Sequence, residues 1–273
     1  MEPFIIESHD PTTAWLASLG QPVASRLLAW EQAQADQLLA DVFGYHAVQL
    51  GWPELQALRQ NRMPHRWQAC AEFEWLGAAP PEGFNPDVWL DSRSWPWQAD
   101  SLDLVVLPHT LERSADPHAC LREVERVLIP EGQVLITGLN PMSAWGWRQT
   151  RGGQRRLLSN TAQPLIGYRR LRDWLRLLGF EVQVSRFGGW TPALATETWM
   201  QRWRWMETAG ERWWPIFGGV YLLLATKRVP AGRLLPAKAW RKVRSPAAAA
   251  APVARSDTLA SRPLTEKDRI DLR

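Results

Sequence analysis

The chain has 273 residues, of which 45% are hydrophobic, so it is long and apolar enough to bury a sizeable core. No apolar stretch reaches the roughly 18–20 residues that span a bilayer, and two cysteines are too few for a disulfide framework. Residues 227–273 hold 12 Lys and Arg against 4 Asp and Glu, whereas residues 1–226 hold 20 against 24. The positive net charge therefore belongs to the tail and says little about what the folded part binds.

The N-terminal part predicts a helix followed by a short strand. Residues 15–42 carry a helical stripe, which consists of Leu27, Leu28, Glu31, Ala35, Leu38 and Leu39. His46–Leu50 is a β-like run, and Pro53 suits the first turn of a helix that continues through Leu58. Residues 65–76 are compatible with a second strand.

The segment 86–141 predicts a parallel sheet. Its expected strands are Asp87–Asp91, Leu102–Leu107 and Gln133–Thr137. The middle run is almost unbroken in its apolar character, as in strands that helices cover on both faces. Asp116 before Pro117 suits a helix N-terminus, and the residues up to Leu128 are amphipathic with a helical period. After a turn at residues 130–132 comes the third strand, and a strand, helix and strand in this order make a parallel crossover.

The later part of the chain predicts a long loop over 138–167 and an amphipathic helix over 168–178, which Gly179 ends. Two further strands are expected, Phe180–Val184 and Val220–Ala225. A tryptophan-rich insertion, 185–218, lies between them.

Three parts are expected along the chain. Residues 1–44 form an N-terminal helical extension, residues 45–228 form the main domain, and residues 229–273 form a basic tail whose composition predicts disorder. The first ten residues do not resemble a secretory signal, and the cysteines are expected to be reduced thiols. We therefore expect a cytoplasmic protein.

Several motifs of the central segment occur in a fixed order. An acidic strand end at Asp91 is followed by the turn Trp95-Pro96-Trp97 and by the strand start Ser101-Leu102-Asp103; Leu107–Glu112, Leu121–Glu123 and Pro130–Gly132 continue the pattern. Together they resemble the class I S-adenosylmethionine-dependent methyltransferases, specifically the methyltransferase type 11 family. The resemblance implies an α/β fold with a Rossmann-like sheet, mostly parallel with an antiparallel edge strand, and with helices on both faces. The strands at 180–184 and 220–225 would fill the antiparallel places.

The resemblance also implies S-adenosylmethionine as cofactor and a small-molecule methyl acceptor, with no metal. The implied cofactor-binding residues are Gly51, Glu72, Asp91, Ser92, Trp95, Leu107 and Pro108. Among them, Gly51 matches the first glycine of the family's glycine-rich turn, Glu72 is the nearest acidic match for the ribose hydroxyls, and Asp91 with Ser92 would accept from the adenine amino group. Asp91 as a simple strand-end cap, and Trp95 as plain packing, are the alternatives.

The glycine-rich turn departs from the family pattern. Trp52 and Pro53 follow Gly51, and they add bulk and remove an amide donor where the backbone of the family approaches the cofactor. The departure supports a second hypothesis, a methyltransferase-like scaffold that has lost catalysis and serves as an interaction module.

Methyl transfer from a sulfonium needs alignment of the acceptor and, for some acceptors, removal of a proton. His109, after the strand 102–107, is a candidate base, and Glu112 on the same loop is a second candidate; a structural hydrogen bond is the alternative for His109.

Three features have more than one interpretation. The arginines of the loop 138–166 could hold an anionic or aromatic acceptor or form a solvated face. The tryptophan-rich insertion could be a lid, a membrane-surface patch or simple packing over the sheet edge. The basic tail could contact nucleic acid or an anionic membrane weakly.

Overall fold

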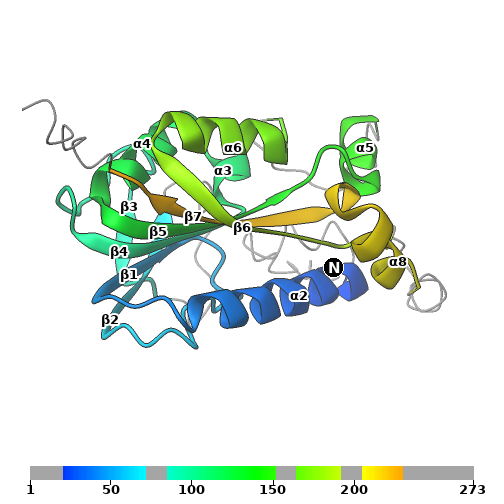
Figure 1. Ribbon diagram of the computed structural model, residues 1–273. Coiled ribbons are helices and arrows are strands. Elements are labelled where there is room, and N and C mark those ends of the chain that lie inside the picture. Colours follow the sequence, from blue (N-terminus) through cyan, green and yellow to red (C-terminus); the bar gives the residue numbers. More distant parts are fainter. Residues whose placement is uncertain (1–20, 72–84, 152–163, 192–204, 230–273) are drawn as a thin grey trace, which may run out of the picture. The chain divides into compact units, whose positions relative to one another are not determined.

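A computed structural model describes residues 21–71, 85–151, 164–191 and 205–229 (Figure 1). The predicted disordered tail from residue 230 onward and residues 192–204 of the predicted tryptophan-rich insertion lie outside these residues. The boundaries of the three predicted parts therefore stay a prediction.

One seven-stranded sheet organises the described part of the chain. Its strands are β1 (His46–Leu50), β2 (His65–Ala71), β3 (Val88–Leu90), β4 (Leu102–Pro108), β5 (Leu128–Leu139), β6 (Phe180–Gly188) and β7 (Val220–Lys227). They lie in the order β3-β2-β1-β4-β5-β7-β6. The first five are mutually parallel, and β7 runs antiparallel to both of its neighbours. The predicted fold class, mostly parallel with an antiparallel edge, is confirmed.

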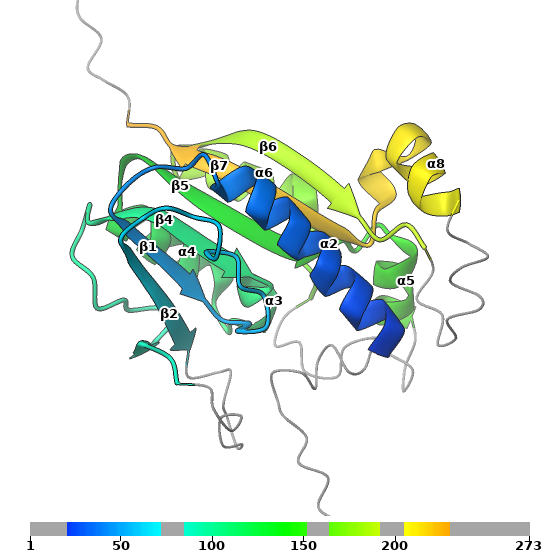
Figure 2. The same cartoon turned by 90° about the horizontal axis from the view of Figure 1, so that it is seen from below.

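Helices cover both faces of this sheet (Figure 1). The helical elements are α2 (Gln21–Leu39), α3 (Thr110–Arg113), α4 (Pro117–Val127), α5 (Ala144–Arg151), α6 (Tyr168–Leu177), α8 (Trp205–Trp213) and the 3-10 turn η3 (Pro215–Phe217). Helix α2 lies on one face and crosses the sheet diagonally, whereas α4 and α6 lie on the other (Figures 1 and 2). None of the helices in the described ranges is long and apolar enough to cross a membrane.

The alternation of side chains along β4 explains its unbroken apolar run. Leu104 and Val106 pack in a cluster with residues of α2, whereas Val105 and Leu107 pack in a second cluster with residues of α4 and α6. Successive residues of a strand point to opposite faces, so a strand covered on both sides needs apolar residues throughout.

Two predicted helix ends are confirmed in their details. Asp116 caps α4 by accepting a hydrogen bond from the Ala119 amide at 2.9 Å, with Pro117 in the first turn. Gly179 follows α6 with a φ of 83°, a left-handed conformation that glycine adopts without strain.

Several boundaries differ from the prediction. Residues 53–58 form turns instead of a helix, because the chain from β1 to β2 is held by side-chain hydrogen bonds of Gln49 (described below). The turn at residues 130–132 lies inside β5 as an irregularity in the pairing with β4, so that β5 begins at Leu128. The predicted loop 138–167 contains α5, and β6 extends to Gly188.

Candidate functional site

The carboxyl ends of β1 and β4 meet at the point where the strand order reverses. In open α/β sheets this crevice is where ligands bind. The Thr110 hydroxyl, directly after β4, donates to the carbonyl oxygen of Leu50 at the end of β1 at 2.7 Å. This bond fixes the position of His109 and of the start of α3, which carries Glu112.

A fully buried cluster of charged groups occupies this position. His109 Nε2 lies 2.8 Å from Glu31 Oε1, and His109 Nδ1 lies 3.2 Å from Glu112 Oε2. The side chains of all three residues are at most 2% exposed. The other Glu112 oxygen accepts from the Leu139 amide at the end of β5. Helix α2, β4 and β5 are thus joined through one imidazole.

The cluster keeps the imidazole charged at neutral pH. Burial by itself lowers the pKa of His109, but the negative charge of Glu31 and the hydrogen bonds to Glu112 and Glu31 outweigh burial and raise the pKa from 6.5 to about 10. A charged imidazolium donates from both nitrogens, which matches its two carboxylate partners. Both ring nitrogens are therefore occupied. The catalytic assignment of His109 and Glu112 stays a prediction, and these contacts favour a positioning role.

The indole of Trp52 fills the space beside this cluster. Trp52 is fully buried, has a φ of 36°, and its ring centroid lies 5.4 Å from that of His109 in an edge-on arrangement. The loop around it is held from inside by Gln49. The Gln49 side-chain amide donates to the carbonyl oxygens of Gly51, Trp52 and Leu55, and its oxygen accepts from the Ala57 amide at 3.1 Å.

Gly51, Leu107 and Pro108 lie at the carboxyl ends of β1 and β4. Gly51 follows β1 with a φ of 84°, which favours glycine, and its carbonyl oxygen accepts from the side-chain amides of Gln49 and Gln68. The Leu107 side chain is buried in the cluster that faces α4 and α6, and Pro108 ends β4. Their role in cofactor binding is untested.

Asp91 and its neighbours form a separate rim after β3, two strands from β1. The Asp91 carboxylate accepts from the Arg93 amide at 2.8 Å and pairs with the Arg93 guanidinium at 3.1 Å. Ser92 is buried, and its carbonyl oxygen accepts from the Trp95 indole at 3.1 Å. Trp95 is itself buried, and its amide donates to Glu123 at 2.8 Å. Trp95 therefore supports the rim from the core side.

The structure brings Gly51, His109 and Glu112 to the ends of the adjacent strands β1 and β4. Asp91 lies two strand spacings, roughly 10 Å, from the end of β1 and three strand spacings from the end of β4. Glu72 follows β2 directly in the sequence but lies outside the described residues. No group of three potential metal ligands occurs among the residues that are described.

Sequence reasoning missed Glu31 as a member of the site. The signal was present, because Glu31 lies on the stripe that also contains Leu27 and Ala35, and a glutamate on a buried stripe needs a partner. The identity of that partner, 78 residues away, follows only from the tertiary structure.

The comparisons with known proteins agree with this architecture. Residues 80–136 match a family model described as a methyltransferase domain. A curated relative, the uncharacterized protein YafS of Escherichia coli strain K12, is 31% identical over 157 residues, which are 57% of this chain and 61% of that protein. The chain thus spans about three fifths of the length of this relative.

Two solved structures resemble the whole sheet. A SAM-dependent methyltransferase from Thermotoga maritima, described as a possible histamine N-methyltransferase, has a TM-score of 0.54 at 16% identity and covers 78% of this chain and 93% of its own. The chain has the class I methyltransferase fold. A SAM-dependent methyltransferase from Archaeoglobus fulgidus, at a TM-score of 0.51 and 17% identity, covers 73% of this chain and 94% of its own. The resemblance predicted from residues 91–132 is confirmed, and S-adenosylmethionine is the cofactor of these similar proteins.

The buried cluster offers a test of whether the cofactor suits this chain. Glu31 Oε2 is buried and has no hydrogen-bond donor among the described residues, and two carboxyl groups flank a single imidazolium. Buried charges require partners, and a sulfonium is a cation. The charge of the cluster therefore suits a cation such as the sulfonium of S-adenosylmethionine, whereas its side chains are at most 2% exposed and the Trp52 indole lies beside it.

Proposed function

We propose that this protein is an S-adenosylmethionine-dependent methyltransferase that acts on a small-molecule acceptor in the cytoplasm. The match of residues 80–136 to a methyltransferase domain carries the proposal, and the strand order, which reverses between β1 and β4, supports it. Two buried cysteines, Cys70 and Cys120, favour a reducing compartment.

The adenosine end of the cofactor would lie against Asp91 and Ser92, and the sulfonium end would lie at the crevice that holds Glu31 and Glu112. The cofactor supplies an electrophilic methyl group, so the chain needs to bind and orient the cofactor and the acceptor and to exclude water. In this arrangement His109 holds one proton on Nε2 and one on Nδ1, and these two N–H groups fix both glutamates. An acceptor that must lose a proton would give it to another group or to solvent.

Isothermal titration of the full chain with S-adenosylmethionine, and with its demethylated product S-adenosylhomocysteine, tests the proposal. Saturable binding of both ligands is expected, with a rise in melting temperature that grows with ligand concentration. Absence of binding at millimolar ligand would defeat the proposal.

The burial of Trp52 beside His109 favours a second candidate, a methyltransferase-like scaffold without catalysis that serves as an interaction module. In that case the indole replaces the cofactor as the filling of the crevice. The two candidates differ in one measurement, because thermal stabilisation of the purified protein by S-adenosylhomocysteine counts against the scaffold.

A further inference from the structure

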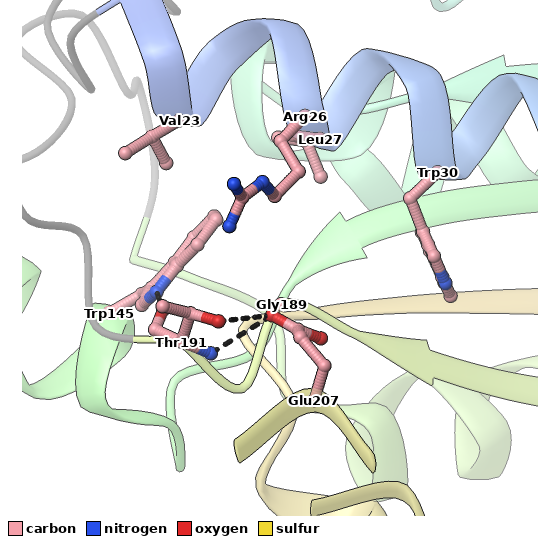
Figure 3. Close-up of a pocket in the computed structure, with 8 residues that line it drawn as sticks. All are labelled: Val23, Arg26, Leu27, Trp30, Trp145, Gly189, Thr191 and Glu207. Carbon is pink, nitrogen blue, oxygen red and sulfur yellow. Dashed lines mark hydrogen bonds between the residues drawn. The ribbon is translucent and has the colours of Figure 1, made fainter. Parts of the chain in front are cut away.

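A cavity of about 270 Å³ lies beyond the carboxyl edge of the sheet, on the side of β5 and β6. Residues from four elements or the loops next to them line it (Figure 3): Val23, Arg26, Leu27 and Trp30 from α2, Trp145 from α5, Gly189 and Thr191 after β6, and Glu207 from α8. β6 runs parallel to β5, since each is antiparallel to β7, so their carboxyl ends share the edge that carries His109.

Glycines allow the two tryptophan walls of this cavity to pack closely. A Cβ atom at Gly188 would lie 2.4 Å from the Trp30 ring, and one at Gly219 would lie 2.7 Å from the Trp145 ring. Gly189 has a φ of 71°, and a Cβ atom there would lie 3.3 Å from the Trp145 ring. The walls are therefore fixed by backbone, and the cavity is formed before any ligand arrives.

The polar atoms of the far wall are paired with one another. The Trp145 indole donates to the Thr191 carbonyl oxygen at 2.8 Å, and one oxygen of Glu207 accepts from the Thr191 amide at 3.1 Å and from the Thr191 hydroxyl at 2.5 Å. Arg26, on the opposite wall, makes no ion pair with any residue in the described ranges, and its guanidinium extends toward Trp145 in Figure 3. Glu207 keeps its negative charge, because Thr191 donates to it from neutral groups, so Arg26 is the group of the lining that can pair with an anion.

The volume sets the size of the occupant. An engineered apolar cavity of ~150 Å³ takes up benzene, so about 270 Å³ accommodates a molecule of two fused rings. The faces of Trp30 and Trp145 suit flat apolar surfaces, and a guanidinium pairs with carboxylates in a charge-assisted manner.

We propose that this cavity binds a two-ring-sized apolar molecule with a carboxylate or similar anionic group, which pairs with Arg26, and that this molecule is the methyl acceptor. The second part rests on the proposed function. Leu27, in the wall of the cavity, lies one helical turn before Glu31 on the same face of α2. A molecule in the cavity is therefore adjacent to the crevice that would hold the sulfonium.

Titration calorimetry with 2-naphthoate as the probe, in the absence of any cofactor, tests the binding site. The uncharged 2-naphthamide and the cationic 2-naphthylmethylammonium are the matched ligands. Wild-type protein is expected to bind the carboxylate at least about tenfold more tightly than either, since one charge-assisted pair contributes at this level. Equal affinity for the three ligands, or no binding of 2-naphthoate, overturns the proposal.

Matched variants locate the contact. Arg26→Gln should lower the affinity for 2-naphthoate about tenfold and leave that for 2-naphthamide unchanged, and Arg26→Lys should recover part of the loss. Arg122→Gln removes an exposed arginine from α4, on the other face of the sheet, and should behave as wild type. Equal loss in both glutamine variants would refute a specific role of Arg26.

The two proposals can fail separately. Binding of 2-naphthoate without any binding of S-adenosylmethionine keeps the anion site and removes its role as acceptor site. Binding of S-adenosylmethionine without 2-naphthoate keeps the methyltransferase and removes the anion site.

Discussion

Replacing Glu31 by glutamine removes the charge that faces His109 and preserves the shape of the side chain. The pKa of His109 is raised from 6.5 to about 10 in the folded protein. Between these two values the folded state keeps a proton that the unfolded chain has released. The stabilisation from this pair is therefore complete below pH 6.5 and is lost as the pH rises toward 10.

The size of the effect follows from linkage. When only the folded state holds a proton, each pH unit of increase lowers the free energy of unfolding by about 1.4 kcal/mol. From pH 7 to pH 9 the wild type should thus lose roughly 3 kcal/mol through His109. At pH 7, Glu31→Gln should cost about 3–5 kcal/mol, because it breaks a buried ion pair by removing one partner.

Urea unfolding followed by tryptophan fluorescence at pH 7, 8 and 9 measures this difference. Other groups also titrate in this range. The informative quantity is therefore the slope of the free energy of unfolding against pH in the wild type minus the same slope in the variant. His109→Asn, which suits the left-handed backbone at φ 51°, removes the titrating group itself and should flatten the slope in the same way.

The exposed pair of Asp36 and Arg59 serves as the control, since Asp36 lies on the same helix α2. Asp36→Asn should leave the slope between pH 7 and pH 9 as in the wild type, because the Asp36 carboxylate does not titrate in this range. Burial raises the pKa of Asp36, but the hydrogen bonds from Arg59 and Gln32 outweigh burial and hold this pKa below its ordinary value. A wild-type slope equal to that of Glu31→Gln would refute the assignment of a charged His109 held by Glu31.

Three further outcomes are expected. Asp91→Asn should weaken binding of S-adenosylhomocysteine about tenfold by calorimetry, and an unchanged affinity would mean that the adenosine lies elsewhere. Gly188→Ala should lower the free energy of unfolding by about 1–3 kcal/mol, because its Cβ would meet the Trp30 ring; unaltered stability in urea would show that the ring can move. Cys70 and Cys120 are buried, and burial raises the pKa of the Cys120 thiol to about 12. Both should therefore react with a thiol reagent at pH 8 only after unfolding, and labelling of the native protein would contradict this burial.

The sequence by itself determined the central sheet and the order of the motifs along it. The apolar run of β4, the cap at Asp116 and the stop at Gly179 are local features, and local backbone chemistry sets them. The strands β6 and β7 also followed from the alternation and apolarity of two short segments, although the C-terminal end of β6 did not, and their antiparallel pairing was implied by the family resemblance. The predicted helix after Pro53 was wrong, because Gln49 binds the carbonyl oxygens that a helix would use itself.

Only the tertiary structure decided what surrounds His109. Its pKa, its two carboxylate partners and the indole beside it come from α2, the loop after β1 and the loop after β4, which folding brings together. The same holds for the cavity near Arg26, whose walls come from residues as far apart as Val23 and Glu207. Periodicity and capping act over a few residues, whereas charge pairing and cavity shape depend on contacts between distant segments, for which a single sequence carries no local signal.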